Sequence, residues 1–298
     1  MIGYDFKIFW DIGQALLAGQ NPYSIPFSVY PPAANYLFTI FALAPFNISY
    51  GIWTGLNLIL FQRSIVRIQK SWRGFAWLGF TPVLFVFLTG QIDILFLWLS
   101  GFLVTNGWTA VAAGVLITLK PQIALIVLPW YLLQWIFHQR PQFLRWLGGT
   151  LILHALPLIV DPTIYQKWLA VVSREPDRRL AFGSGVFALT NLNIPLALIG
   201  ILAAVIVVFG LTRDAMFSKA AQQLALPSIL WYENVLLIGS TPWWLLVPVS
   251  WVAFIAGTQV HSNYPFFIIP LASLLWQWFG KVGKKETATP EKALQSSV

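Results

Sequence analysis

The chain has 298 residues, of which 58% are hydrophobic, 16% aromatic and only 9% charged, and its mean hydropathy is +0.72. Soluble globular proteins carry about 25% charged residues, so this composition excludes an ordinary soluble domain. The net charge of +8 would suit nucleic-acid binding, but the basic residues cluster between hydrophobic runs, as in loops that face the cytoplasm. No cysteine is present, which excludes disulfides and thiolate metal sites.

Long stretches without a charged residue indicate the fold class. No Asp, Glu, Lys or Arg occurs between Asp11 and Arg63 or between Glu233 and Lys281. A spanning helix needs about 20 apolar residues, and the apolar residues do not alternate as they do in barrel strands. The sequence therefore predicts an all-α, polytopic integral membrane helical bundle. We expect residues 1–280 to form a single transmembrane domain, followed by a polar cytoplasmic tail over 281–298.

The opening segment is mildly amphipathic and carries two carboxylates, Asp5 and Asp11. Apolar side chains recur at helical spacing from Ile8 to Leu16, and Gly19 is a suitable helix stop. We expect this helix to lie flat at the membrane surface, so that a carboxylate reaches the boundary between lipid and water.

The next apolar segment, 32–44, is short and ends at Pro45. A full crossing here would place Asp5 and Arg63 on the wrong sides. We therefore expect a half-length or re-entrant helix, which belongs to a first extracytoplasmic loop over 1–46. Irregular backbone at membrane depth is tolerated where protein or a water-filled cavity covers it. A crossing at roughly 47–62 follows.

The remaining crossings are placed by the basic clusters, which we assign to the inside. Those clusters are Arg63, Arg67, Lys70 and Arg73, then Arg140 and Arg145, then Arg213 and Lys219, and finally Lys281, Lys284 and Lys285. Four apolar segments between the first two clusters, 74–89, 92–104, 107–119 and 122–138, return the chain to the same side. A crossing at 146–160, an extracytoplasmic loop at 161–193 and a return at 194–212 follow. The stretch 220–280 has room for four short crossings or two long ones.

Four motifs occur in order within residues 4–140. They are Asp5-x-x-x-Phe9 with Leu17-Ala18-Gly19-Gln20-Asn21-Pro22-Tyr23, then Tyr30-Pro31-Pro32-Ala33, then Thr89-Gly90-Gln91-Ile92-Asp93, and lastly Gly114-Val115-Leu116-Ile117-Thr118-Leu119-Lys120-Pro121. Each motif alone is weak, but the ordered set resembles the DUF2029 group, glycosyltransferase family 87, which has the GT-C fold. Residues 160–298 carry no comparable signature.

The resemblance implies a bacterial plasma-membrane enzyme with an extracytoplasmic active site. Such an enzyme transfers a hexose, usually mannose, from a polyprenyl-phosphate donor to a glycan or glycolipid acceptor, with no metal, nucleotide sugar or other cofactor. Family members usually have a transmembrane helix before the first loop, whereas Met1 lies four residues ahead of Asp5 here. Either the start codon is misassigned or the chain lacks that helix.

The resemblance also implies a catalytic base at the position of Asp5. Displacing a lipid-linked phosphate from a sugar carbon needs an acceptor hydroxyl activated by a base and cations around the departing phosphate. Asp11 is the second candidate base, although it falls off the Asp5 face of the helix, so the two would not form a tight pair. The simpler alternative is that Asp5 is a solvated acid at a frayed terminus.

Gln91, Asp93 and Lys120 are polar residues beside apolar runs, and an ionisable group inside a membrane is a functional candidate by default. In one interpretation, an Asp93–Lys120 ion pair holds two helices in register. In the other, Lys120 steers the donor phosphate as a point charge. One residue can do both.

Further candidates for substrate binding lie in both halves of the chain. Cations in the loop 161–193 run against the positive-inside trend, so they are candidates for phosphate binding. A solvated face is the favoured alternative, because long loops are largely exempt from the trend. His261 and Glu233 are candidates for donor contact. The full candidate set is Asn21, Tyr23, Tyr30, Gln91, Asp93, Lys120, Arg174, Arg178, Arg179, Glu233 and His261.

Two other classes remain open on the sequence. A secondary transporter or lipid flippase would also be polytopic with sparse intramembrane charges, but it predicts an internal repeat, and none is visible. A structural or partner-binding membrane subunit, catalytically degenerate, would explain a missing first helix.

Overall fold

The computed structural model describes residues 2–69, 72–105, 107–173, 185–187, 190, 194–226, 230–260 and 262–285. Over these residues the regular elements are α-helices and short 3₁₀ helices, which agrees with the predicted all-α class. One isolated bridge joins Ile238 to Thr241.

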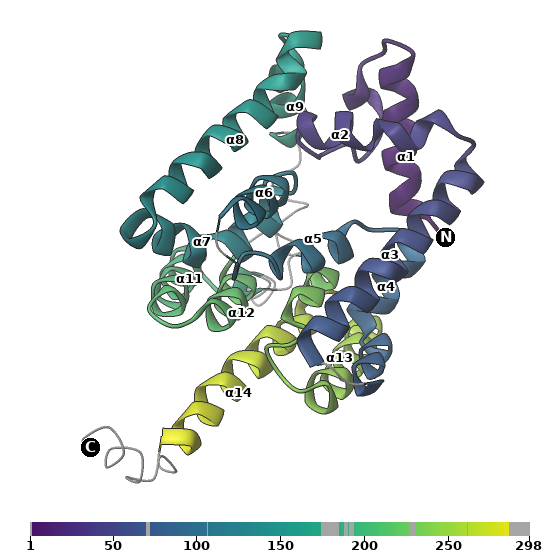
Figure 1. Cartoon of the computed structure of the whole chain (residues 1–298). Coiled ribbons are helices and arrows are strands. Elements are labelled where there is room, and N and C mark those ends of the chain that lie inside the picture. The colour runs from purple at the N-terminus through teal and green to yellow at the C-terminus, as the bar shows by residue number, and fades with distance from the viewer. Residues whose placement is uncertain are drawn as a thin grey trace.

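Figure 1 shows the elements of the described residues in chain order, coloured from the N-terminus to the C-terminus. The α-helices are α1 (Tyr4–Leu17), α2 (Pro32–Phe38), α3 (Phe46–Gln69), α4 (Thr81–Thr89), α5 (Asp93–Ser100), α6 (Trp108–Ile117), α7 (Pro121–His138), α8 (Arg140–Val160), α9 (Ile164–Val172), α11 (Leu196–Leu211), α12 (Ala215–Ala225), α13 (Trp243–Val260) and α14 (Ile268–Lys285). The 3₁₀ helices are η1 (Pro22–Ser24), η2 (Thr39–Leu43), η3 (Trp72–Gly79), η5 (Trp231–Leu237) and η6 (Tyr264–Phe267).

The amphipathic α1 forms as the sequence predicted. Its buried face contains Phe6, Phe9 and Ile12, which are at most 3% exposed, and it packs against α2 and η2. The helix ends just before Gly19, which has a φ of 67°, a left-handed conformation that suits glycine at a helix end. The predicted helix stop is therefore confirmed.

The predicted half-length helix and the crossing after it meet at a sharp bend. The apolar stretch Pro32–Leu43 and the helix Phe46–Ile68 form an angle of 117°. By length and composition, two helices of the described chain, Arg140–Val160 and Trp243–Val260, are able to cross a membrane, and this bent pair would make a third. A bend of this size is compatible with a broken span as well as with a re-entrant segment.

The expectation of four crossings between Arg73 and Arg140 is not matched by the helix lengths. The helices α4, α5 and α6 have 9, 8 and 10 residues, which corresponds to about 12–15 Å at 1.5 Å per residue. A bilayer core is about 30 Å thick. Each of these helices is therefore too short to span alone. The predicted segment 74–89 is divided between η3 and α4, and α5 ends at Ser100, before the end of the segment 92–104.

Lys219 was expected in a basic loop on the inside, and the structure corrects this. The residue lies on α12, where it is only 5% exposed. Every residue of α12 from Phe217 to Ala225 is buried, and the helix packs between α7, α11 and α14. A short connection after α11 thus returns the chain into the bundle instead of leaving Lys219 in solvent.

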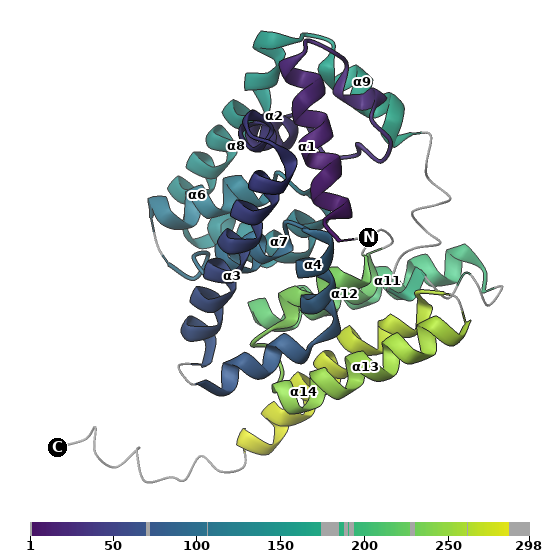
Figure 2. The ribbon, with the colours of Figure 1, turned by 90° about the vertical axis from the view of Figure 1, so that its right-hand side faces the viewer.

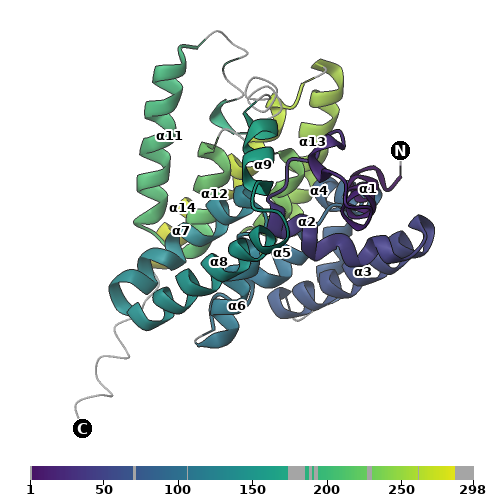
Figure 3. The same cartoon turned by 90° about the horizontal axis from the view of Figure 1, so that it is seen from above.

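The helices gather at two ends of the molecule. Figure 2 shows α1, α2 and α9 together at one end, with α13 and α14 side by side towards the other, and contacts between α2 and α9 and between α13 and α14 agree. Seen from above, α11 lies at the edge opposite α3 (Figure 3). The main apolar core, which includes Trp53, Trp77 and Phe80, extends from α1 and α2 to α13 and α14.

Candidate functional site

Three breaks in the helical backbone meet beside the start of α1 and bring polar side chains together. The first break separates α4 from α5 and contains Gly90 and Gln91. The second separates α6 from α7, where Lys120 is the N-cap residue. The third is η5, which contains Tyr232 and Glu233. Backbone breaks inside an apolar bundle leave peptide groups and polar side chains that must find partners in the protein.

The first break requires glycine and anchors α1. Gly90 has a φ of 77°, and a Cβ added there would lie 2.7 Å from the Cβ of Phe6. Its carbonyl accepts a hydrogen bond of 2.9 Å from the Trp53 indole. The amide of Gly3 donates a 2.7 Å hydrogen bond to the carbonyl of Leu88. The start of α1 is thus fixed directly on the end of α4.

Lys120 lies at the centre of a buried charge cluster. Its Nζ is 2.8 Å from Oδ1 of Asp93 and 2.9 Å from Oε1 of Glu233. The three residues are 2%, 0% and 0% exposed, respectively. The predicted Asp93–Lys120 ion pair is confirmed, and Glu233 joins it from η5. The other oxygen of Glu233 accepts a 3.0 Å hydrogen bond from the amide of Leu230.

A layer of hydrogen-bonded side chains lies over this cluster. Tyr30 donates through its hydroxyl to Oε1 of Gln91 at 3.2 Å, and Nε2 of Gln91 donates to the hydroxyl of Tyr232 at 3.2 Å. The ammonium of Lys120 lies 5.3 Å from the centre of the Tyr232 ring, a cation–π geometry. Both ends of the Gln91 amide are therefore fixed, which determines the orientation of that side chain.

Asp5 lies at the edge of this layer and is partly buried. The side chains of Thr89 and Gln91 and the charges of Lys120 and Asp93 act on its carboxylate. Burial raises the pKa of the Asp5 carboxyl above its usual value, and Thr89, Gln91 and Lys120 offset that effect only in part. A carboxylate with a raised pKa is a stronger base than one in water.

Asp11 lies elsewhere. Its carboxylate forms an ion pair with Lys7, one helical turn earlier, and both side chains are substantially exposed, at 33% and 47%. The structure therefore brings Asp5, but not Asp11, next to Gln91 and the Lys120 cluster.

The remaining motif residues of the first loop support the layer from outside. The Asn21 side chain accepts a 3.1 Å hydrogen bond from the amide of Tyr23 and so caps η1. The Tyr23 hydroxyl donates to the carbonyl of Tyr30 at 3.0 Å. On the far side, the Trp168 indole on α9 donates to the carbonyl of Val29 at 3.0 Å. The backbone around Tyr30 is therefore held from two directions.

Four candidate residues fall outside the described part of the chain. They are Arg174, Arg178, Arg179 and His261. Within the described residues, no group of three or more His, Asp or Glu side chains is placed to hold a metal ion.

Sequence reasoning singled out Gln91 and Asp93 but gave no role to Thr89 and Tyr232. Thr89 opens the motif that ends at Asp93, and Tyr232 precedes Glu233 in the sequence. The signal that was available is closeness in sequence, since Thr89 lies four residues before Asp93 and Tyr232 directly precedes Glu233. His154 was also given no role, because the histidines lack metal-ligand spacing. Its ring lies 3.0 Å from the Thr118 hydroxyl and 3.2 Å from that of Tyr165.

Comparison with known proteins identifies a family that the chain matches. The model of glycosyltransferase family 87 matches residues 28–256. The match covers Tyr30, Gln91, Asp93, Lys120 and Glu233, while Asp5 precedes it. No curated protein and no solved structure matches the chain. Because the family model covers more than half of the sequence, the chain belongs to glycosyltransferase family 87, a family of membrane-associated enzymes.

Proposed function

We propose that this glycosyltransferase transfers a hexose, with mannose as the first choice, from a polyprenyl-phosphate donor to a glycan or glycolipid acceptor outside the membrane. The observation that supports this most strongly is the position of Asp5. Its carboxylate lies at the start of an amphipathic helix, beside Gln91 and next to the buried cluster around Lys120. A base is thus presented at the edge of a bundle that is otherwise apolar.

In the proposed reaction, Asp5 takes the proton of the acceptor hydroxyl as the acceptor oxygen attacks the anomeric carbon of the sugar. The bond between that carbon and the phosphate oxygen breaks, and the polyprenyl phosphate leaves with the bonding electrons. No metal or other cofactor takes part in this proposal. The raised pKa of the Asp5 carboxyl favours it as the proton acceptor.

The departing phosphate needs positive charge nearby. We assign that task to Arg174, Arg178, Arg179 and His261, which the sequence places in the second extracytoplasmic loop and between two late apolar segments. Lys120 is a weaker candidate for direct phosphate contact, because it is buried and two carboxylates already neutralise its charge. We therefore propose that Asp93, Lys120 and Glu233 hold Gln91 and Tyr232 in place.

The first loop would help to bind substrate through Tyr30 and Gln91, whose hydrogen bond closes the layer over the cluster. Asn21 and Tyr23 would contribute indirectly, by fixing the loop that carries Tyr30. The loops at 1–46 and 161–193 lie outside the membrane in this proposal, the tail at 281–298 lies inside, and the bundle adopts a GT-C arrangement in a bacterial plasma membrane.

A direct test uses purified protein in phospholipid nanodiscs with a radiolabelled mannosyl polyprenyl phosphate. The proposal predicts time-dependent loss of sugar from the lipid and its appearance on a sugar acceptor, without added metal. Two other results would overturn it. Movement of intact donor across liposomes without cleavage would indicate a flippase, and binding without either process would indicate a degenerate subunit. Glucosyl donor is the second substrate to test if mannosyl donor is inert.

A further inference from the structure

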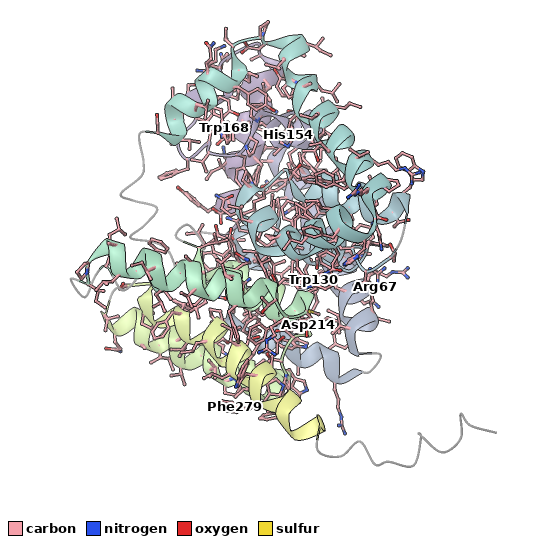
Figure 4. All side chains as sticks on the ribbon, turned by 90° about the vertical axis from the view of Figure 1, so that its left-hand side faces the viewer. Arg67, Trp130, His154, Trp168, Asp214 and Phe279 are labelled. Carbon is pink, nitrogen blue, oxygen red and sulfur yellow. The ribbon has the colours of Figure 1, made fainter. Side chains whose placement is uncertain are left out.

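A large cavity lies far from Asp5, at the opposite end of α7. Its volume is about 730 Å³, and it is bordered by the second half of α7, the start of α12 and the last turns of α14. Tyr131 is eleven residues beyond Lys120, or about 16 Å along the helix axis at 1.5 Å per residue. Figure 4 shows Trp130 and Asp214 close together at this end, away from His154 and Trp168. The indole of Trp130 donates to the carbonyl of Arg213 at 2.7 Å.

The wall of this cavity combines aromatic faces with amides. Trp130, Tyr131, Trp135 and Trp276 supply the rings, and Gln134 and Gln277 are among the amides. Tyr131 and Trp135 are 7% and 2% exposed, so they are part of the interior and do not belong to an outer belt of interfacial anchors. No lysine or arginine is among the lining residues that the structure describes.

Some polar groups of the wall have no partner in the described protein. The Tyr131 hydroxyl and the Gln134 amide make no hydrogen bond there, although both border the cavity. Gln277 uses its Nε2 for a 3.2 Å hydrogen bond to Ser273 and leaves its carbonyl oxygen for another donor. Tyr131, Gln134 and Trp135 occupy one face of α7 at the i, i+3 and i+4 spacing. One helix face thus presents two rings and an uncommitted amide.

We propose that this cavity is a carbohydrate-binding site that takes the uncharged hexosyl headgroup of a glycolipid. An amide offers both donors and an acceptor, which suits neighbouring sugar hydroxyls. Aromatic faces pack against the C–H face of a pyranose, because the electron-rich ring attracts weakly positive hydrogens. An anionic headgroup fits less well, since the described wall offers it no lysine or arginine and includes the carboxylate of Asp214. The site is separate from Asp5, so it does not depend on which residue is the base.

The volume of the cavity and the apolar side chains beside it favour a glycolipid as the molecule that carries the hexosyl group. Pockets of about 300–1,000 Å³ hold ligands of drug size, so one hexose and the first part of a lipid chain fit here. Exposed apolar side chains of α7 and α14, such as Phe137 at 70% and Phe279 at 65%, flank this end of the molecule. They would contact an alkyl chain that extends from the headgroup.

The test is a binding measurement on the full chain in phospholipid nanodiscs, with sugar-based detergents avoided throughout. The probes are octyl β-glucoside and octyl α-mannoside below their micelle concentrations, followed by saturation-transfer NMR. Octyl phosphocholine, which has the same tail without a sugar, is the amphiphile control. The proposal expects saturation of the sugar ring protons with at least one glycoside and no displacement by octyl phosphocholine. Equal binding of both kinds of amphiphile, or no binding of either glycoside, would overturn it.

Substitutions in the cavity test whether the glycoside binds there. Gln134→Leu and Trp276→Leu should each weaken glycoside binding at least tenfold, whereas Gln62→Leu and Trp108→Leu, which alter exposed residues elsewhere, should not. Thermal unfolding checks that each variant is folded, and the pair keeps the test valid if one is not. Unchanged affinity in both cavity variants would contradict the proposal.

A competition experiment shows which part of the glycolipid is recognised. If free hexose at millimolar concentration displaces the glycoside, the sugar alone suffices for binding. If it does not, the lipid chain is needed as well, and both results support a hexosyl site.

Discussion

The polar cluster around Lys120 and the cavity beside Gln134 contrast in how their polar groups are satisfied. In the cluster, Lys120 has two carboxylate partners and Gln91 is bonded at both ends of its amide. In the cavity, Gln134 has no partner in the described chain. Buried groups that bond one another stabilise the fold and fix the position of their neighbours. Groups left without partners contribute little to folding and remain open to a ligand. Stability measurements should therefore separate the two regions.

The largest expected effect follows removal of the central cation. Lys120→Met leaves the carboxylates of Asp93 and Glu233 buried without a counter-charge, and breaking a buried pair costs about 3–5 kcal/mol. Thermal unfolding in nanodiscs should show a large drop in Tm. The matched control is Lys167→Met, which breaks the more exposed pair with Asp161 and should cost less than about 1 kcal/mol. Equal drops in the two variants would show that burial of the cluster does not matter.

A smaller effect is expected at the helix break that joins α1 to the cluster. Gly90→Ala introduces a side chain at positive φ, which costs about 1–3 kcal/mol, and its Cβ would also collide with Phe6. The collision should displace α1, so transfer activity should fall along with Tm. Gly19→Ala separates the two causes, because Gly19 also has a positive φ, of 67°, but open space around it. If both variants lose the same stability and activity, the collision with Phe6 has no effect of its own on α1.

Much of this region was predictable, and the reasons are local. Asp93 and Lys120 each stand out as charges beside apolar runs, so the need to neutralise them predicts their pairing. The end of α1 near Gly19 follows from the special backbone freedom of glycine. The participation of Glu233 could not be derived in the same way, because no spacing rule relates η5 to a helix break more than a hundred residues earlier.

The predicted crossings between residues 74 and 119 are not matched by helices of spanning length, for a different reason. Hydropathy reports that a segment is apolar, but not how much of it is α-helical. The segment 74–89 is divided between η3 and α4, with Pro82 in the first turn of α4, and α5 ends at Ser100 although the apolar run continues to Val104. Lys219 was misplaced for a related reason, since α12 is short and polar in sequence yet surrounded by other helices.

The next prediction concerns pH. Thr89→Val removes a group that lowers the pKa of the Asp5 carboxyl, so that pKa should rise further. The carboxylate form, which the base requires, is then reached only at higher pH. The acid limb of the kcat/KM profile should therefore move to higher pH. Thr39→Val is the control, since both threonines bond the carbonyl four residues earlier and only Thr89 faces Asp5. A shift to lower pH, or equal profiles, would exclude the interaction.

The smallest effect is expected in the cavity. Gln134→Leu removes a side chain that has no hydrogen-bond partner in the described chain, so unfolding stability should change by no more than about 0.5 kcal/mol. Thermal unfolding without glycoside measures this directly. A loss as large as that of Lys120→Met would mean that Gln134 is a structural residue and would remove the contrast between the two regions.

The central claim is that the Asp5 carboxylate accepts the proton of the acceptor, and the mannosyl-transfer assay tests it most directly. Asp5→Asn keeps the size of the side chain and removes its basicity, so the turnover rate should fall by about 10²-fold or more while the protein inserts and unfolds normally. Asp11→Asn, which alters the exposed pair with Lys7, should retain turnover close to that of the natural chain. Near-normal turnover in Asp5→Asn, or its loss in Asp11→Asn alone, would contradict the account.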